Sequence, residues 1–252
     1  NSTAKDFRTK HRIKIEEEII KKIKYFGIRT KEMMNIILSL NPKAKLYWHN
    51  YPLNIPEFQK SNESDYDIVF FARVCKDKGI EDLLVALSIV KQEMPNVCLH
   101  IIGPISNSYK YKLNNMIQTL HLEQNVIFKG FMPTQEEVFK HAVKAKICVL
   151  PTYHDIIPGT IIESMYMKLP VIAYAVGGIP ELNQNTETIR LVNKQDINSL
   201  AKEILYLLNN EIKRVKMAND AYDYAKKRFN NEEIVPILLE IYSEIIRLET
   251  IK

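Results

Sequence analysis

The sequence has no apolar stretch that approaches the roughly 20 residues a helix needs to cross a bilayer. Its strongest apolar runs, residues 147–150 and 171–175, have only the length of strands, so we expect no transmembrane helix. The opening residues 1–12 are polar and basic and lack the apolar core of a secretory signal peptide. Because the chain opens with Asn1, we expect a trimmed start and not a secretory one.

Cysteine is scarce, and no group of side chains has the spacing of a metal site. The cysteines lie far apart, form no C-x-x-C pair and sit in part within apolar runs, which predicts reduced thiols and a cytoplasmic protein. The histidines show no metal-ligand spacing, so we expect no bound metal and no cofactor. We expect the following histidines to be hydrogen-bonded or exposed: His49, His100, His121, His141 and His154.

Charge is nearly balanced, with a formal net charge of +5 over 252 residues. The basic residues are spread over helix faces instead of forming a stripe interleaved with aromatics, so we expect no nucleic-acid partner. Lys21, Lys22 and Lys24 could contact anionic lipid and place the chain at the inner face of a membrane. A solvated helix face is the more common explanation of such residues.

From residue 67 onward, short β-branched or aromatic runs alternate with longer amphipathic stretches, as in repeated βα units around a parallel sheet. The predicted strands are residues 68–72, 97–102, 125–128, 146–150, 170–173 and 188–191. The predicted helices are residues 79–92, 109–121, 134–142, 160–167 and 197–209. This order predicts an α/β fold with a doubly wound, Rossmann-like parallel sheet, whose ligands bind beyond the carboxyl ends of the strands.

The two ends of the chain do not continue this pattern. Residues 1–50 contain only a helix, a strand, a helix and a strand, predicted over 14–24, 25–29, 31–40 and 46–49, so we interpret them as the remnant of another domain. Residues 51–66 contain prolines and a polar run, which indicates a linker before a domain spanning 67–230. Residues 231–252 hold a helix, predicted over 233–248, that is apolar on adjoining faces.

A basic loop follows the first predicted strand of the main domain. It contains Arg73, Lys76 and Lys78 just before a helix. Arginine offers a planar fork of donors and lysine a point charge, so together they could bind a diphosphate and stabilise its charge. From this segment alone, a solvated basic loop is an equally good explanation.

A second loop, residues 151–163, follows a predicted buried strand and opens a helix. Gly159 lets the backbone approach a ligand closely, and the N–H groups of a helix start bind anions. Asp155 and Glu163 flank this point and could hold hydroxyl-bearing groups on either side of a phosphate. Thr160-Ile-Ile-Glu163 also fits a capping box, and Asp155 could equally be a turn residue.

This second loop and the segment after it resemble the family 4 retaining glycosyltransferases, which have the GT-B fold. That family has an acidic residue, seven intervening residues and a Glu at a helix start, followed by a Pro-Val strand and a Gly-Gly-x-x-Glu turn. All of these are present between residues 155 and 182, with Asp155 where the family usually has Glu. Upstream, Phe71-Ala-Arg73 and Lys78-Gly79 match the family's Arg and Lys-Gly pair. The loop after Ile102 departs from the family, because it lacks the second glycine that is common there.

The resemblance implies a role for each candidate residue. Arg73 and Lys78 would bind the diphosphate of the donor, and Asp155 would bind a hydroxyl of the transferred sugar; these are the predicted catalytic residues. Glu163 would bind the ribose hydroxyls. The helix start at Gly159-Thr160 would present backbone donors to sugar or phosphate.

The sequence therefore predicts part of a hexosyltransferase that moves a sugar from a nucleoside diphosphate, of the UDP or GDP type, to an acceptor hydroxyl. The resemblance implies retention of configuration, no metal, and a place in polysaccharide or glycoconjugate synthesis. The carbohydrate or lipid-linked acceptor would be bound by an N-terminal domain, of which residues 1–49 retain only the last elements. Two alternatives stay open: a non-catalytic nucleotide-sugar-binding module that completes a partner chain, and a sugar-nucleotide epimerase of similar architecture.

Overall fold

The computed structural model describes residues 2–50, 52, 53, 55, 64–183 and 186–250. The chain divides into two compact units, one formed by Asn1–Leu53 together with Phe229–Lys252 and the other by Asn54–Arg228. Most of the predicted linker, residues 51–66, lies outside the described residues. The main sheet begins at Tyr66, the last residue of that predicted linker.

The larger unit is built on a six-stranded parallel sheet with the order β5-β4-β3-β6-β7-β8. The chain runs outward from β3 to β5 and then returns to the other side of β3, so the winding direction reverses between β3 and β6. This topology confirms the predicted doubly wound α/β fold. The strands are β3 (Tyr66–Phe71), β4 (Leu99–Ile102), β5 (Val126–Gly130), β6 (Ala145–Leu150), β7 (Val171–Tyr174) and β8 (Ile189–Val192).

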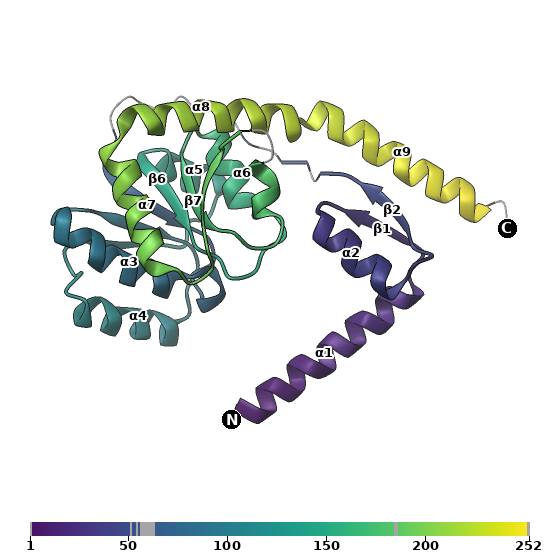
Figure 1. Cartoon of the computed structure of the whole chain (residues 1–252), viewed down its shortest axis with the longest axis horizontal. Helices are drawn as coiled ribbons and strands as arrows, with labels where there is room; N and C mark the ends of the chain where they lie inside the picture. Colours follow the sequence, from purple (N-terminus) through teal and green to yellow (C-terminus); the bar gives the residue numbers. More distant parts are fainter. Residues whose placement is uncertain (1, 51, 54, 56–63, 184–185, 251–252) are drawn as a thin grey trace. The chain divides into compact units, whose positions relative to one another are not determined.

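Helices connect these strands and cover the sheet (Figure 1). Crossovers between parallel strands are right-handed as a rule, and with this strand order that rule places α3 and α4 on one face and α5 and α6 on the other. Helix α7 packs against α3. The helices are α3 (Ile80–Glu93), α4 (Asn107–Thr119), α5 (Gln135–Ala142), α6 (Gly159–Tyr166), α7 (Ile197–Asn209) and α8 (Glu211–Arg228). Short 3-10 turns, η1 (Lys76–Lys78) and η2 (Ile179–Asn183), follow β3 and β7.

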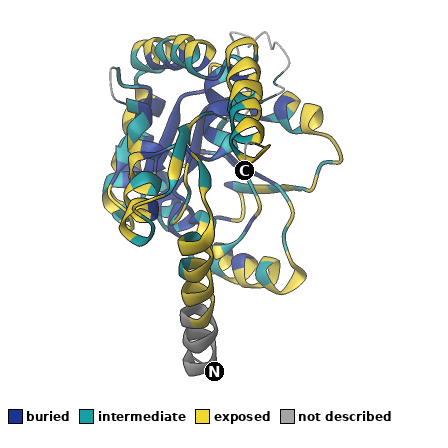
Figure 2. Cartoon of the chain, turned by 90° about the vertical axis from the view of Figure 1, so that its right-hand side faces the viewer, coloured by how far each residue is buried: buried dark blue, intermediate teal, exposed yellow. Residues whose placement is uncertain are grey.

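The core of the larger unit lies on its central strands, which are drawn in dark blue in Figure 2. Four consecutive residues at the end of β3 and four at the end of β6 are buried, as expected for strands covered on both faces. At the edge of the sheet, β5 has no fully buried residue. Strand β5 continues to Gly130, beyond the predicted end at residue 128. The prediction stopped too early because the exposed Lys129 gives no apolar signal.

The sequence pattern predicts no helix between residues 210 and 232, yet α8 occupies residues 211–228. Its buried side chains are Met217, Ala218, Ala221 and Ala225, and alanines give a weak apolar pattern. The predicted helix 109–121 also differs from α4, which begins at Asn107 because the Ser106 hydroxyl accepts a hydrogen bond from the Tyr109 N–H at 3.3 Å.

The smaller unit contains α1 (Ser2–Lys22), β1 (Tyr25–Ile28), α2 (Lys31–Leu40), β2 (Lys45–Trp48) and α9 (Asn231–Thr250). The strands form a two-stranded parallel sheet. The first helix begins well before the predicted residue 14. Within the described residues, the buried apolar side chains of this unit are Ile28, Ile37, Phe229 and Ile234. The apolar core of this unit is therefore small among the described residues.

Many large apolar side chains of the smaller unit are exposed. They include Ile15, Ile19 and Ile23 on or after α1 and Leu239, Tyr242 and Ile246 on α9. No helix in the described part of the chain is long and apolar enough to span a membrane. Lys21 pairs with Glu18 at 2.7 Å and Lys24 with Glu249 at 2.6 Å. Contact of these lysines with lipid stays a prediction.

Candidate functional site

A cavity of about 370 Å³ opens at the carboxyl ends of β3, β4 and β5 and at the starts of α5 and α6. It collects four of the predicted site residues, which are Arg73, Gly159, Thr160 and Glu163. The other lining residues are Phe71, Ala72, Ile102, Gly103, Pro104, Phe131, Met132, Gln135 and Val138. Lys78 and Asp155 do not line this cavity.

Backbone contacts join the loops that form the floor of the cavity. Gly103 has a φ of +140°, and a Cβ on it would lie 2.0 Å from the carbonyl oxygen of Ala72, so a side chain there is excluded. The Gly103 N–H donates to the carbonyl of Gly130 at 2.8 Å, and the Val74 N–H donates to the carbonyl of Pro104 at 2.9 Å. Pro104 therefore joins the loop after β4 to the loop after β3, although the sequence departs from the family pattern here.

One end of the cavity is suited to an anion. Arg73 is exposed, and no carboxylate among the described residues pairs with it. Helix α6 begins at Gly159 after the N-cap residue Pro158, which supplies no side-chain cap. The Thr160 hydroxyl donates to the carbonyl of Phe71 at 3.0 Å and so ties the helix start to the end of β3. The first N–H groups of a helix have no partners within it, and with a cation nearby they form an anion site.

The capping-box interpretation of Glu163 is wrong. Helix α6 starts before Thr160, whose hydroxyl bonds to the backbone of β3 and not to its own helix. The Glu163 carboxylate instead accepts a hydrogen bond of 2.9 Å from the Gln135 amide on α5. Burial raises the pKa of Glu163 to about 7, and the Gln135 hydrogen bond opposes this shift. Glu163 is thus a carboxylate held in a cavity wall with an unusually high proton affinity.

Gln135 is a site residue that sequence reasoning missed. It is the first residue of α5, and it lines the cavity opposite Glu163. The available signal was its position after β5, because the loops that follow parallel strands gather at one edge of the sheet.

Lys78 and Asp155 pair with each other. The Lys78 Nζ lies 2.6 Å from Asp155 Oδ2, and each side chain is 20% exposed. The pair joins η1 to the loop after β6, so the two positions predicted to contact a donor are adjacent. The sequence indicates that both residues follow strand ends but does not predict their contact.

Glycines allow the loop that carries Asp155 to pack tightly. Gly79 has a φ of +73°, and a Cβ there would lie 1.8 Å from the carbonyl oxygen of Pro151. Gly177 has a φ of +53°, and its Cβ would lie 1.8 Å from the carbonyl oxygen of Asp155. The Gly178 N–H donates to the carbonyl of Ile156 at 2.7 Å. The Gly-Gly turn of the sequence motif therefore packs directly against the backbone of the loop at Asp155 and Ile156.

A buried aspartate binds this loop and strand β7 through two phenols. Asp82 on α3 accepts hydrogen bonds of 2.7 Å from the hydroxyls of Tyr153 and Tyr174. The two rings stack with centroids 6.2 Å apart. Burial and the hydrogen bond to Asp82 raise the pKa of both phenols. These tyrosines therefore act as donors that satisfy a buried carboxylate.

The structure shows the surroundings of the histidines, cysteines and possible metal ligands. The expectation that each histidine is hydrogen-bonded or exposed is wrong for His100, whose buried Nδ1 has no partner and whose ring stacks on Tyr66 at 3.7 Å. Burial lowers its pKa to about 4. The cysteines are free thiols, as predicted: Cys75, Cys98 and Cys148. Among the described residues, no group of three His, Cys, Asp or Glu side chains could hold a metal. Independence from metal stays a prediction.

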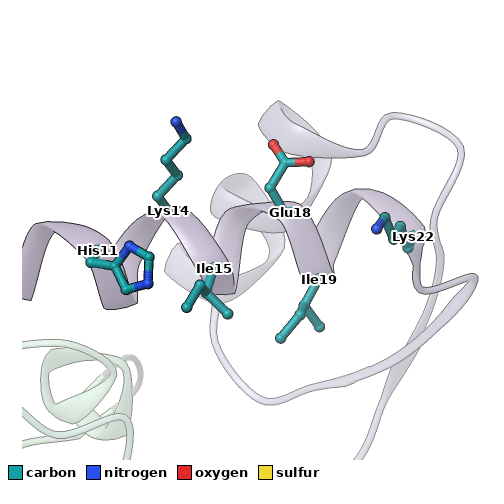
Figure 3. Close-up of a pocket in the computed structure, with 6 residues that line it drawn as sticks. All are labelled: His11, Lys14, Ile15, Glu18, Ile19 and Lys22. Atoms are coloured by element: carbon teal, nitrogen blue, oxygen red, sulfur yellow. The ribbon is translucent and has the colours of Figure 1, made fainter.

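A second hollow, of about 420 Å³, lies along α1 (Figure 3). All of its lining residues come from that helix: His11, Lys14, Ile15, Glu18, Ile19 and Lys22. In Figure 3, Ile15 and Ile19 point to one side of the helix and Lys14 and Glu18 to the other. Because all the lining side chains come from one helix, they do not converge on a common point, and the hollow does not resemble a binding site.

The geometry agrees with comparisons to known proteins. Residues 53–228 match the family described as "Glycosyl transferases group 1". Over 196 residues the chain is 24% identical to the poly(ribitol-phosphate) alpha-N-acetylglucosaminyltransferase of Staphylococcus aureus, covering 77% of this chain and 37% of that protein. The chain spans less than half the length of the curated relatives it matches.

Solved structures with low sequence identity share the fold. Sucrose-phosphate synthase from Thermosynechococcus elongatus superposes with a TM-score of 0.84 at 22% identity, over 95% of this chain and 62% of that one. HepE of Anabaena, solved with UDP-glucose, gives a TM-score of 0.78 at 18% identity, over 93% of this chain and 67% of that one.

Proposed function

The chain belongs to the group 1 glycosyl transferases, and on that premise we propose that it binds a nucleoside-diphosphate sugar and supplies the donor side of a hexosyl transfer. The observation that carries this proposal is the cavity at the reversal of winding, which places Arg73, the start of α6 and Glu163 around one space. Cationic and backbone donors suit a diphosphate, and a carboxylate suits vicinal hydroxyls. HepE, which shares the fold, was solved with a ligand of this class.

Within this proposal each residue has a distinct task. Arg73 binds the diphosphate, with backbone N–H groups of Gly159 and Thr160 directed at phosphate or sugar. Glu163 accepts hydrogen bonds from the ribose hydroxyls, displacing Gln135. Lys78 stabilises the departing diphosphate, and Asp155, one methylene shorter than the usual Glu, reaches a hydroxyl of the transferred sugar.

The proposed reaction retains configuration. The bond between the sugar's anomeric carbon and the diphosphate breaks, with its electron pair going to the diphosphate. The acceptor hydroxyl attacks from the same face, and its proton passes to the departing phosphate oxygen. The cations and the α6 helix start provide the charge stabilisation that a metal gives elsewhere.

We further propose that another domain completes the site and holds a carbohydrate or lipid-linked acceptor, as in polysaccharide or glycoconjugate synthesis at the cytoplasmic face of a membrane. The small core of the smaller unit and the partial coverage of longer relatives support this idea. The same observations favour the alternative that this chain is a non-catalytic binding module for a partner chain. Transfer assays on the chain with and without a co-expressed relative's N-terminal domain distinguish the two.

The binding proposal is tested by isothermal titration calorimetry with UDP and GDP in the presence of a chelator. We expect binding of at least one nucleoside diphosphate with the same affinity whether or not Mg²⁺ is added. Binding that requires Mg²⁺ or Mn²⁺, or no binding at millimolar ligand, contradicts the proposal.

A further inference from the structure

Thr152 is a fully buried polar residue in the loop after β6, and its hydroxyl lies between two loops of the site. Its Oγ1 is 2.8 Å from Asp155 Oδ2, 3.2 Å from the carbonyl oxygen of Asp77 and 3.3 Å from that of His154. A hydroxyl has one proton to donate. The charged carboxylate is both the nearest and the strongest acceptor, so the proton is directed to Asp155.

The same carboxylate oxygen accepts a hydrogen bond from Lys78. The Lys78 Nζ approaches Asp155 Oδ2 at 2.6 Å, so Thr152, Asp155 and Lys78 form a short chain of contacts. An ammonium group has three N–H donors, and the pair with Asp155 uses one of them. The remaining donors of Lys78 stay available to an anion while Asp155 fixes the position of its nitrogen.

Backbone hydrogen bonds already join the loops that carry Thr152, Asp155 and Lys78, so the Thr152 hydroxyl is well placed to orient the Asp155 side chain. The Tyr153 N–H donates to the carbonyl of Asp77 at 2.8 Å, beside the position where Gly79 meets Pro151. With the backbones joined, the freedom that remains lies in the side chains of Asp155 and Lys78, and the Thr152 hydroxyl restricts that of Asp155.

We propose that Thr152 is a positioning residue, which orients the Asp155 carboxylate so that Lys78 is held ready for the diphosphate of the donor. This inference rests on the proposed function for its ligand. Thr152 contacts no substrate and acts through Lys78. A purely structural role differs in its outcome, because it lowers the stability of the fold without changing how Lys78 binds an anion.

Thr152→Val removes the hydroxyl while keeping nearly the same shape and, unlike a change at Asp155, alters no charge. We expect it to weaken binding of the nucleoside diphosphate by about threefold to tenfold, the range that the net strength of one hydrogen bond spans. Thr152→Ser keeps the hydroxyl and should restore affinity to within about twofold. Thr188→Val is the matched control, since Thr188 is also fully buried with its hydroxyl bonded at 2.9 Å to the carbonyl of Leu182.

The experiment titrates UDP or GDP, whichever the parent chain binds, into these variants and into Thr152→Val combined with Lys78→Ala. If Thr152 acts through Lys78, the valine substitution causes no further loss once Lys78 is absent. Loss of the same size in both backgrounds, a serine variant as weak as the valine variant, or a similar loss in Thr188→Val overturns the inference.

A measurement without ligand keeps this inference separate from the proposed function. NMR relaxation of the Lys78 side-chain nitrogen should show greater mobility in Thr152→Val than in the parent and in Thr152→Ser. Unchanged mobility contradicts the positioning role even if nucleotides bind. If the parent chain binds no nucleoside diphosphate, the proposed function fails, and the relaxation data alone decide whether Thr152 orders Lys78.

Discussion

Replacing Glu163 with Gln tests whether its carboxylate serves the ligand or the fold. The substitution keeps the size of the side chain and its contact with Gln135 but removes the charge. In the parent chain, burial raises the pKa of Glu163 from its ordinary 4.5 to about 7. The folded state therefore resists ionisation that the unfolded chain undergoes freely.

The sign of the effect follows from this difference. A carboxyl group whose pKa is higher in the folded state lowers the free energy of unfolding as pH rises from 4.5 to about 7. Above that range the destabilisation is fully present. A shift of this size corresponds to about 3 kcal/mol at about 1.4 kcal/mol per pKa unit. Because Glu163 faces an open cavity, solvent screening reduces the cost, and we expect about 1 to 2 kcal/mol.

We therefore expect Glu163→Gln to be more stable than the parent chain in urea denaturation at pH 8, with the difference disappearing toward pH 5. Nucleotide affinity should change in the opposite direction, falling by about tenfold, or about 1.4 kcal/mol, at pH 8. In the parent chain, affinity should also fall as the pH drops below 7, because the protonated carboxyl accepts hydrogen bonds poorly. Calorimetric titrations at several pH values measure this dependence, which the variant should lack.

Two results would refute this reasoning. A variant that is less stable than the parent at pH 8 would show that the carboxylate supports the fold. A variant with the parent's affinity would show that Glu163 does not contact the ligand, whatever its pKa.

The other predictions concern the cations, Asp155 and the isolated chain. Arg73→Ala and Lys78→Ala should each weaken nucleoside diphosphate binding by about 1.5 to 3 kcal/mol in calorimetry, and a smaller loss at Arg73 would place the diphosphate elsewhere. Asp155→Asn should reduce discrimination among donor sugars but change affinity for the free diphosphate little. The variant weakens the ion pair that positions Lys78, but it also removes a negative charge that repels the diphosphate, and these two effects oppose each other. A large change in affinity in either direction would contradict this explanation. The isolated chain should show no sugar transfer beyond slow donor hydrolysis and should self-associate in analytical ultracentrifugation through its exposed apolar side chains. Transfer at the rate of ordinary enzymes would show that the acceptor site is misplaced.

The sequence predicts the main sheet well because its central strands are nearly continuous apolar runs. The carboxyl ends of parallel strands meet at one edge of the sheet. Arg73 and Glu163 could therefore be expected to share a site, although they are 90 residues apart in the sequence. Helix α8 escaped prediction because alanines form most of its buried face. Edge strand β5 was harder to delimit because exposure interrupts its pattern.

Side-chain partners within the site could not be predicted in the same way. The pair of Lys78 with Asp155 depends on the path of its loops, where Gly79 and Gly177 make close backbone contacts, and the pair of Gln135 with Glu163 depends on where α5 and α6 begin. Such contacts require a left-handed backbone at a particular glycine, and composition alone does not indicate which glycine adopts it. The sequence therefore indicates the chemistry of the site, whereas the structure is needed to determine its pairings.

The buried Asp82 limits how this site could be rebuilt by protein engineering. A loop taken from another transferase to change donor preference would replace Tyr153, and Asp82 would then keep only the hydroxyl of Tyr174 as a donor from this pair. A buried carboxylate that loses a donor is costly. A successful graft must therefore carry a phenol at position 153 or replace Asp82 at the same time, so the exchangeable segment includes a residue of α3 that lies far away in the sequence.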